Sequence, residues 1–220
     1  MYKVILFDLD GTLTDPKLGI TKCVEYSLAK LGISEPNLDM LEKFIGPPLQ
    51  ESFAKIYGFD IETTNRAIEY YRERFREKGM YENEVYSGIS SLLASLKNQE
   101  KIVVVATSKP TVFAEKILQH FCLDQYFDLI VGSNLDGTRT SKTDVIQYIL
   151  EEYPEFEKHQ FLMIGDREHD IIGANNTRID SIAVTYGYGT FAELEVVKPT
   201  CIVKDVEELR EKLTFECISG

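Results

Sequence analysis

The sequence has 220 residues, of which 44% are hydrophobic and 27% are charged. Proteins of this length and composition bury a core, so we exclude a disordered chain and expect one domain that carries a sizeable insertion. The formal net charge of −12 also excludes the basic surface with which proteins attract nucleic acids or anionic membranes, and we expect neither as a partner.

Short apolar runs bounded by polar turns recur along the chain and predict buried strands. These runs span residues 3–7, 101–106, 127–131, 161–165 and 181–184. Segments with helical periodicity lie between them, such as residues 141–153, where Val145 and Ile149 share one face. Strands that alternate with helices predict an α/β fold, with a parallel Rossmann-like sheet flanked by helices.

The long segment after the first strand breaks this alternation, because it contains no strand-like run. Apolar residues recur three and four positions apart in it, as Ala67 and Tyr71 do, which indicates amphipathic helices. We therefore expect an α-helical cap domain at residues 17–81. It is inserted after the first strand of a core domain that comprises residues 1–16 and 82–220.

The first apolar run and the cysteines predict the location of the protein. The run is too short for a signal peptide, and no later stretch approaches the length of a membrane span. The chain has four cysteines and no C-x-x-C pair, which predicts buried thiols in a reducing compartment. We therefore expect a cytoplasmic protein.

Polar residues that can bind a ligand follow three of the predicted strands. Ligands of parallel sheets bind outside the carboxyl ends of the strands, so residues at these positions are expected to meet in one site. The candidates are Asp8, Asp10, Thr107, Ser108, Asp166 and Asp170, together with Lys142 at the start of the helix before the strand at 161–165.

This set of side chains predicts phosphate chemistry. Carboxylates about 4 Å apart repel each other by roughly 4 kcal/mol at an effective dielectric constant near 20, so the cluster needs protons or a cation, and its oxygen ligands suit Mg²⁺. Asp8 would attack phosphorus to form an aspartyl-phosphate, and Asp10 would protonate the leaving oxygen and then activate water. Thr107 and Ser108 would donate hydrogen bonds to the phosphate, while Lys142 would neutralise its charge.

In chain order, these residues resemble the motifs of the haloacid dehalogenase-like hydrolases, a superfamily dominated by Mg²⁺-dependent phosphatases. DLDGT at residues 8–12 looks like the first motif, and VVVATS, which ends at Ser108, looks like the second. Lys142 falls where the lysine of the third motif is expected, and GDREHD at residues 165–170 looks like the fourth motif. The resemblance spans the whole chain.

The resemblance implies a role for each acidic residue and for the helical insertion. Asp8 would be the nucleophile and a metal ligand, and Asp10 would be the general acid and base, with its carbonyl group on the metal. Asp166 would be a further metal ligand, and Asp170 would lie beside it. The insertion is similar to the small α-helical cap of the family, a lid that selects the substrate and excludes water. We hypothesise that Lys17 and the turn from Gly46 to Gln50 face the mouth of the site.

Within the superfamily, the chain looks most like the phosphoglycolate phosphatase group, some members of which act on nucleoside monophosphates. The resemblance implies a phosphatase of small phosphorylated metabolites, and we expect a monomer or a homodimer. Two other functions fit the same residues. A sugar-phosphate mutase would transfer the phosphoryl group within its substrate, and a signalling module would hold the phosphoryl group on Asp8 without hydrolysing it.

Two assignments within the site also have alternatives. Thr107 and Ser108 could cap the next helix, with Pro110 in its first turn. Lys109 competes with Lys142 for the contact with phosphate.

The segment GYGTFA at residues 187–192 matches the dinucleotide fingerprint G-x-G-x-x-A, and Asp205 follows at about the distance of its acidic residue. However, the segment follows the last predicted strand rather than the first, and Pro199 would cut the next helix short. We therefore predict a loop beside the site, and not a nicotinamide-dependent oxidoreductase.

Overall fold

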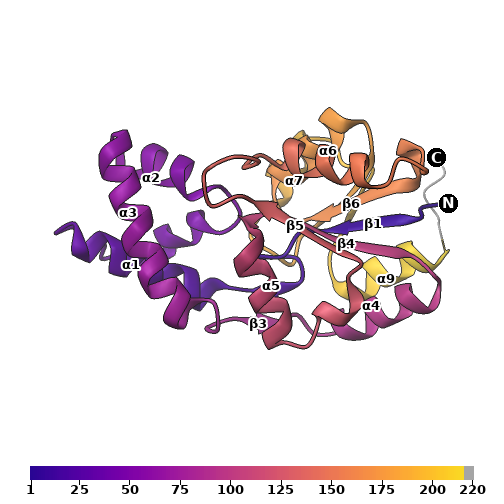
Figure 1. Ribbon diagram of the computed structural model, residues 1–220, viewed down its shortest axis with the longest axis horizontal. Helices are drawn as coiled ribbons and strands as arrows, with labels where there is room; N and C mark the ends of the chain where they lie inside the picture. Colours follow the sequence, from indigo (N-terminus) through magenta and orange to yellow (C-terminus); the bar gives the residue numbers. More distant parts are fainter. Residues whose placement is uncertain (216–220) are drawn as a thin grey trace. The chain divides into compact units, whose positions relative to one another are not determined.

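Six parallel strands form the main sheet of the computed structural model, which describes residues 1–215 (Figure 1). In spatial order they are β5 (Leu129–Ser133), β4 (Ile102–Pro110), β1 (Val4–Phe7), β6 (Phe161–Gly165), β7 (Asp180–Val184) and β8 (Cys201–Val203). The predicted parallel α/β fold is confirmed. The sequence pattern does not reveal β8, because three residues are too few to give a periodic signal. Strands β2 (Thr14–Asp15) and β3 (Glu84–Val85) form a separate two-stranded sheet.

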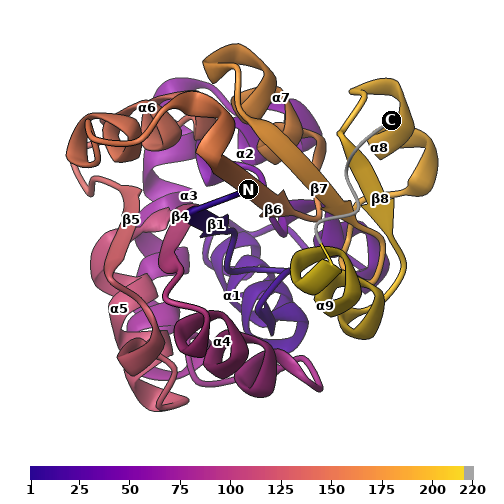
Figure 2. The ribbon, with the colours of Figure 1, turned by 90° about the vertical axis from the view of Figure 1, so that its right-hand side faces the viewer.

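Helices cover both faces of the main sheet (Figure 2). One face carries α6 (Lys142–Glu152) and α7 (Glu168–Thr177), and the other carries α4 (Ile89–Asn98), α5 (Thr111–His120) and α9 (Val206–Phe215). The helix α8 (Phe191–Val196) follows β7, and 3₁₀ helices span Leu38–Phe44, Asp124–Tyr126 and Lys158–Gln160. The predicted apolar face of the 141–153 segment is buried, since Val145 and Ile149 of α6 pack in one core with Leu6 and Met163.

Strand β1 lies in the centre of the sheet, and its composition explains this position. The side chains of Val4–Phe7 are at most 1% exposed, because β4 and β6 pair with the strand on either side and helices cover both faces. Only a continuous apolar run suits such a strand. The polar residues that follow β1 therefore lie at the carboxyl edge of the sheet, beside the ends of β4 and β6.

The chain divides into two compact units. The first consists of Met1–Asp15 and the residues from Val85 onward, and the second consists of Pro16–Glu84. The second unit contains α1 (Lys17–Lys30), α2 (Leu49–Tyr57), α3 (Ile61–Arg74) and a π-helical turn at Phe75–Gly79, and it buries apolar side chains of its own, such as Leu28, Phe53 and Ala67.

Their roles as hydrolase core and cap remain predictions. Within the second unit, Lys17 forms an ion pair with Glu42, and the Gln50 amide donates to Asn65 Oδ1 over 3.3 Å. These contacts do not test the hypothesis that Lys17 and the turn from Gly46 to Gln50 face the mouth of the site, which stays a prediction.

None of the helices within residues 1–215 combines the length and the hydrophobicity that crossing a membrane requires. Cys23, Cys122 and Cys201 carry free thiols, and Cys217 lies outside the described residues. Cys23 is buried, but the prediction of buried thiols is wrong for Cys122, which is exposed. The reason is that Cys122 lies in the left-handed turn after α5, with φ of 55°, and not on an apolar face.

Candidate active site

Asp8 and Asp10 lie directly after β1 and are only 2% and 7% exposed. The Asp8 N–H donates to the carbonyl oxygen of Ile164 over 2.9 Å, so the pairing with β6 continues one residue beyond β1 and fixes Asp8. Gly11 then turns the chain with φ of 86°. No residue with a side chain could replace Gly11 without a shift of its surroundings, because a Cβ atom at this position would lie 2.2 Å from Asp166 Oδ2.

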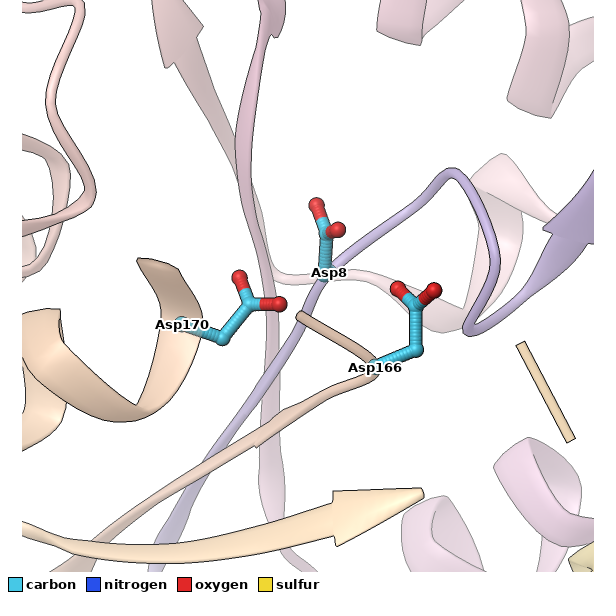
Figure 3. A group of neighbouring side chains, drawn as sticks. All are labelled: Asp8, Asp166 and Asp170. Carbon is cyan, nitrogen blue, oxygen red and sulfur yellow. The ribbon is translucent and has the colours of Figure 1, made fainter. Parts of the chain in front are cut away.

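Three of the predicted acidic residues form one cluster (Figure 3). Asp166 comes from the loop after β6, and Asp170 comes from the first turn of α7. One carboxylate oxygen from each of Asp8, Asp166 and Asp170 lies within 4.8 Å of the other two. All three residues are at most 2% exposed, so their charges are poorly screened by water.

Lys142 enters this cluster from the start of α6. Its Nζ lies 2.6 Å from Asp8 Oδ1 and 2.5 Å from Asp170 Oδ1, and it donates to the carbonyl oxygen of Ala106 over 2.7 Å. Its side chain is 3% exposed. Ser141 caps the helix by accepting a hydrogen bond from the Asp144 N–H over 3.1 Å, which fixes the turn that carries Lys142.

Lys109 forms an ion pair with a different carboxylate, that of Asp10. Its Nζ is 2.7 Å from Asp10 Oδ2, and the two side chains are 7% and 9% exposed. Of the two competing lysines, Lys142 therefore contacts Asp8, while Lys109 contacts Asp10. This pairing depends on the irregular end of β4, where the register with β5 shifts between Ala106 and Pro110.

Thr107 and Ser108 lie in the last part of β4. Thr107 is 2% exposed, and its Oγ1 accepts from the Lys109 N–H over 3.2 Å, while the Ser108 carbonyl accepts from Ser133 Oγ over 2.9 Å. The alternative that they cap the next helix is wrong. That helix, α5, begins only at Thr111, and Pro110 precedes it as the N-cap residue, because β4 continues through Pro110.

Burial is the largest cause of the raised pKa values of Asp170, Asp166 and Asp10. It raises the pKa of Asp170 to about 6, although Lys142 opposes the shift. It raises the pKa of Asp166 well above the usual value, and the charges of Asp8 and Asp170 add to this effect. Burial also raises the pKa of Asp10, against the opposing charge of Lys109. Burial alone would lower the pKa of Lys142, but Asp170 and Asp8 together raise it.

These residues fit a hard divalent cation. The ionised cluster contains three carboxylates and one ammonium group, so it retains excess negative charge. Within residues 1–215, Asp10 Oδ1 is buried and accepts no hydrogen bond. All the donors are oxygen atoms, which Mg²⁺ prefers to nitrogen or sulfur.

Residues 5–184 match the protein family described as haloacid dehalogenase-like hydrolase. The chain belongs to this family. The crystal structure of a predicted phosphatase from Clostridium acetobutylicum is similar to this structure with a TM-score of 0.94 and 52% identity, over 97% of this chain and 98% of that one. The resemblance inferred from the motifs is therefore confirmed.

Curated relatives in this family carry different names. A 5′-nucleotidase of Pseudomonas aeruginosa is 50% identical over 212 residues, which cover 96% of each chain. The tyrosine-protein kinase PtkA of Mycobacterium tuberculosis is 35% identical, over 96% of this chain and 72% of that protein. A phosphoglycolate phosphatase of Aquifex aeolicus is 30% identical, over 92% of this chain and 95% of that protein.

Sequence reasoning missed the groups of this haloacid dehalogenase-like hydrolase that hold Asp166. Thr12 Oγ1 donates to Asp166 Oδ1 over 3.3 Å, and the Tyr188 N–H donates to Asp166 Oδ2 over 2.7 Å. Tyr186 Oη in turn donates to the Thr12 carbonyl over 2.9 Å. Burial raises the pKa of Tyr186, and the charge of Asp166 adds to this, so the hydroxyl remains a donor. The only sequence signal for these contacts is the pair of glycines on either side of Tyr188.

Proposed function

We propose that this protein is a Mg²⁺-dependent phosphatase that hydrolyses small phosphate monoesters through an aspartyl-phosphate at Asp8. The observation that carries the proposal is the buried contact of 2.6 Å between Asp8 and Lys142 inside a carboxylate cluster. An ammonium group at this distance orients the carboxylate as a nucleophile and offsets the negative charge that an incoming phosphate brings.

The proposed substrates follow from the names of the relatives. The protein that shares 50% identity is a 5′-nucleotidase, so we propose nucleoside 5′-monophosphates as the first substrates to test. Phosphoglycolate is the second, because a relative with 30% identity is a phosphoglycolate phosphatase. Both substrates are small and anionic, and the net charge of −12 adds to the need for a cation at the site.

Mg²⁺ would be held by the carboxylates of Asp8 and Asp166 and by the carbonyl oxygen of Asp10. Enzymes of the haloacid dehalogenase-like family generally use this ion, and the all-oxygen donor set of the cluster suits it. When bound, Mg²⁺ neutralises the charge of the carboxylates and of the phosphoryl oxygens. Asp170 would stay outside the ligand set and orient Lys142, to which it is paired.

The residues of the chain would carry out two successive transfers. In the first, a carboxylate oxygen of Asp8 attacks phosphorus, the bond from phosphorus to the ester oxygen breaks, and Asp10 gives that oxygen its proton. In the second, Asp10 takes a proton from a water molecule, which attacks phosphorus and releases inorganic phosphate and the Asp8 carboxylate. The raised pKa of Asp10 supports its role as the proton donor. Thr107 and Ser108 would donate to the phosphoryl oxygens.

The test is the release of phosphate from p-nitrophenyl phosphate, nucleoside 5′-monophosphates and phosphoglycolate, with Mg²⁺ and with EDTA. The Asp8→Asn variant should lose roughly 10³-fold or more of the activity. The matched control is Asp124→Asn, which changes an exposed aspartate in the same unit and should keep full activity.

Two results would contradict the proposal. A labelled phosphoryl group that stays on Asp8 for minutes without release would indicate a signalling module. Interconversion of hexose phosphates without net phosphate release would indicate a mutase.

A further inference from the structure

The loop after β7 carries the motif Gly187-Tyr188-Gly189, to which the proposed reaction gives no role. Its resemblance to a dinucleotide fingerprint has a different cause in this fold. The helix that follows, α8, has only six residues, and the faces of both glycines are occupied by the loop that contains Asp166. A pyrophosphate bound at these glycines would have to displace the buried carboxylate of Asp166, so the glycines serve a structural role other than dinucleotide binding.

Both glycines are required by close contact with Asp166. A Cβ atom at Gly187 would lie 2.4 Å from Asp166 Oδ2 and 2.3 Å from the Gly11 carbonyl oxygen. A Cβ atom at Gly189 would lie 1.9 Å from the Asp166 carbonyl oxygen. Because neither position has a side chain, the backbone comes close enough for the Tyr188 N–H to donate to Asp166 Oδ2 over 2.7 Å.

These contacts give the two oxygens of Asp166 different surroundings. Oδ2 is enclosed by Gly11, Gly187 and the N–H of Tyr188. Oδ1 accepts a longer bond of 3.3 Å, from the Thr12 hydroxyl. The loop therefore fixes the rotation of the carboxylate and leaves Oδ1 as the oxygen better able to bind a ligand.

The same segment anchors the residues that follow Asp166. Glu193 Oε1, in the first turn of α8, accepts from Arg167 Nε over 3.0 Å and from the Glu168 N–H over 3.1 Å. Thr190 caps α8 by accepting from the Glu193 N–H over 3.1 Å, which holds Glu193 in place. Glu193 therefore ties the segment to Arg167 and to the start of α7, independently of the bond between the Tyr188 N–H and Asp166.

We propose that the segment Tyr186–Glu193 is a positioning element that holds the Asp166 carboxylate in the orientation required to bind Mg²⁺. The inference rests on the proposed function in one respect, the role of Asp166 as a metal ligand. It adds that the affinity for the ion depends on residues of a separate strand-to-helix loop that do not themselves touch it. Groups that orient metal ligands in this way typically contribute 10- to 100-fold to metal affinity.

The experiment is a calorimetric titration of EDTA-treated and dialysed protein with Mg²⁺. We expect Gly187→Ala to weaken binding by about 10- to 100-fold, because the new methyl group displaces Asp166 Oδ2. Glu193→Ala removes the contacts with Arg167 and Glu168 without adding atoms near Asp166, and it should weaken Mg²⁺ binding at least several-fold. Glu193→Gln keeps an acceptor for the Glu168 N–H and should therefore bind Mg²⁺ more tightly than Glu193→Ala. The control Gly58→Ala places a methyl group in open space at a left-handed position of the second unit and should bind Mg²⁺ like the wild type.

The outcomes separate the inference from the proposed function. If the wild type binds Mg²⁺ and hydrolyses phosphate esters but folded Gly187→Ala and Glu193→Ala bind the ion equally well, the inference is overturned and the function stands. If Gly187→Ala does not fold, Glu193→Ala and its Gln counterpart decide alone. If the wild type itself binds no Mg²⁺, the proposed function fails and the inference falls with it.

Discussion

Lys142 Nζ lies 2.6 Å from Asp8 Oδ1, and both side chains are only 3% exposed. The same ammonium group lies 2.5 Å from Asp170, so it is the main compensation for two buried carboxylates. We expect Lys142→Met to lower the free energy of unfolding by about 3–5 kcal/mol in EDTA, since it leaves these charges without a partner. Urea unfolding followed by circular dichroism measures this change.

Two variants serve as controls for this prediction. Lys97→Met removes a more exposed ion pair with Asp128, in which the side chains are 32% and 38% exposed, and should cost less than about 1 kcal/mol. Asp8→Asn removes one negative charge from the cluster and should leave the stability in EDTA unchanged or higher, although activity is lost. Equal stability of Lys142→Met and the wild type would show that the cluster is already neutralised by protons.

The pH dependence of stability follows from Asp170. Burial raises its pKa from 3.8 to about 6 in the folded chain, so between these values the folded state binds a proton that the unfolded state has released. The resulting stabilisation is fully present below about pH 4 and is lost as the pH rises through about 6. We therefore expect Asp170 alone to lower the free energy of unfolding in EDTA by up to about 3 kcal/mol over this range.

The comparison with Asp170→Asn isolates this contribution, because the amide does not titrate. Thermal unfolding between pH 4 and 8 should show a shallower fall for the variant than for the wild type. Millimolar Mg²⁺ should raise the melting temperature of the wild type more at pH 7.5 than at pH 5, since the ion competes with protons for the carboxylates. Parallel pH curves for the two proteins would show that Asp170 is ionised throughout.

The sequence was sufficient to predict that Asp8 and Asp166 meet, because each follows a strand that is buried on both faces. Such strands have a continuous apolar run, and their polar ends must meet at one edge of a parallel sheet. The contact of Lys142 with Asp8 is less local. Its place at the start of a helix and the order of the family motifs suggest a role for Lys142, but the contact itself forms only when helix α6 packs on the sheet.

The remaining contacts leave weak traces in the sequence. The donor that holds Asp166 Oδ2 is a backbone N–H, which any residue except proline would supply at position 188, so only the flanking glycines indicate it. The pairing of Lys109 with Asp10 depends on a register shift at the end of β4, which has no signature in residue type. For the same reason, α5 begins later than the sequence suggests.

Lys109 should set the pH at which Asp10 acts. Burial raises the pKa of Asp10, and the charge of Lys109 limits the rise, so Lys109→Met should raise this pKa further. The acidic limb of the kcat profile depends on ionised Asp10, which acts as the base in the second transfer, and should therefore move to higher pH.

Lys109→Arg is the matched variant, because it keeps the positive charge. The measurement is kcat between pH 5 and 9 at saturating Mg²⁺ and substrate. A uniform loss of kcat without a shift of the limb would assign Lys109 to the substrate phosphate instead.

Ser141 should link the stability of α6 to catalysis. Its Oγ accepts from the Asp144 N–H over 3.1 Å and donates to Asp144 Oδ2 over 2.7 Å, immediately before Lys142. Ser141→Ala should cost about 1 kcal/mol of stability and lower kcat several-fold, because the turn that carries Lys142 loosens. Ser141→Thr keeps both the acceptor and the donor at the N-cap and should retain the wild-type stability and kcat.

Asp205→Ala provides the comparison that separates the two effects of Ser141. Asp205 accepts from the Glu208 N–H over 2.8 Å at the start of α9, so its loss should cost similar stability without reaching Lys142. Urea unfolding and kcat are measured on all three variants and the wild type. If Ser141→Ala and Asp205→Ala lose equal stability and both keep the wild-type kcat, the cap supports only the helix. A fall in kcat confined to Ser141→Ala would show that the N-cap holds Lys142 against Asp8.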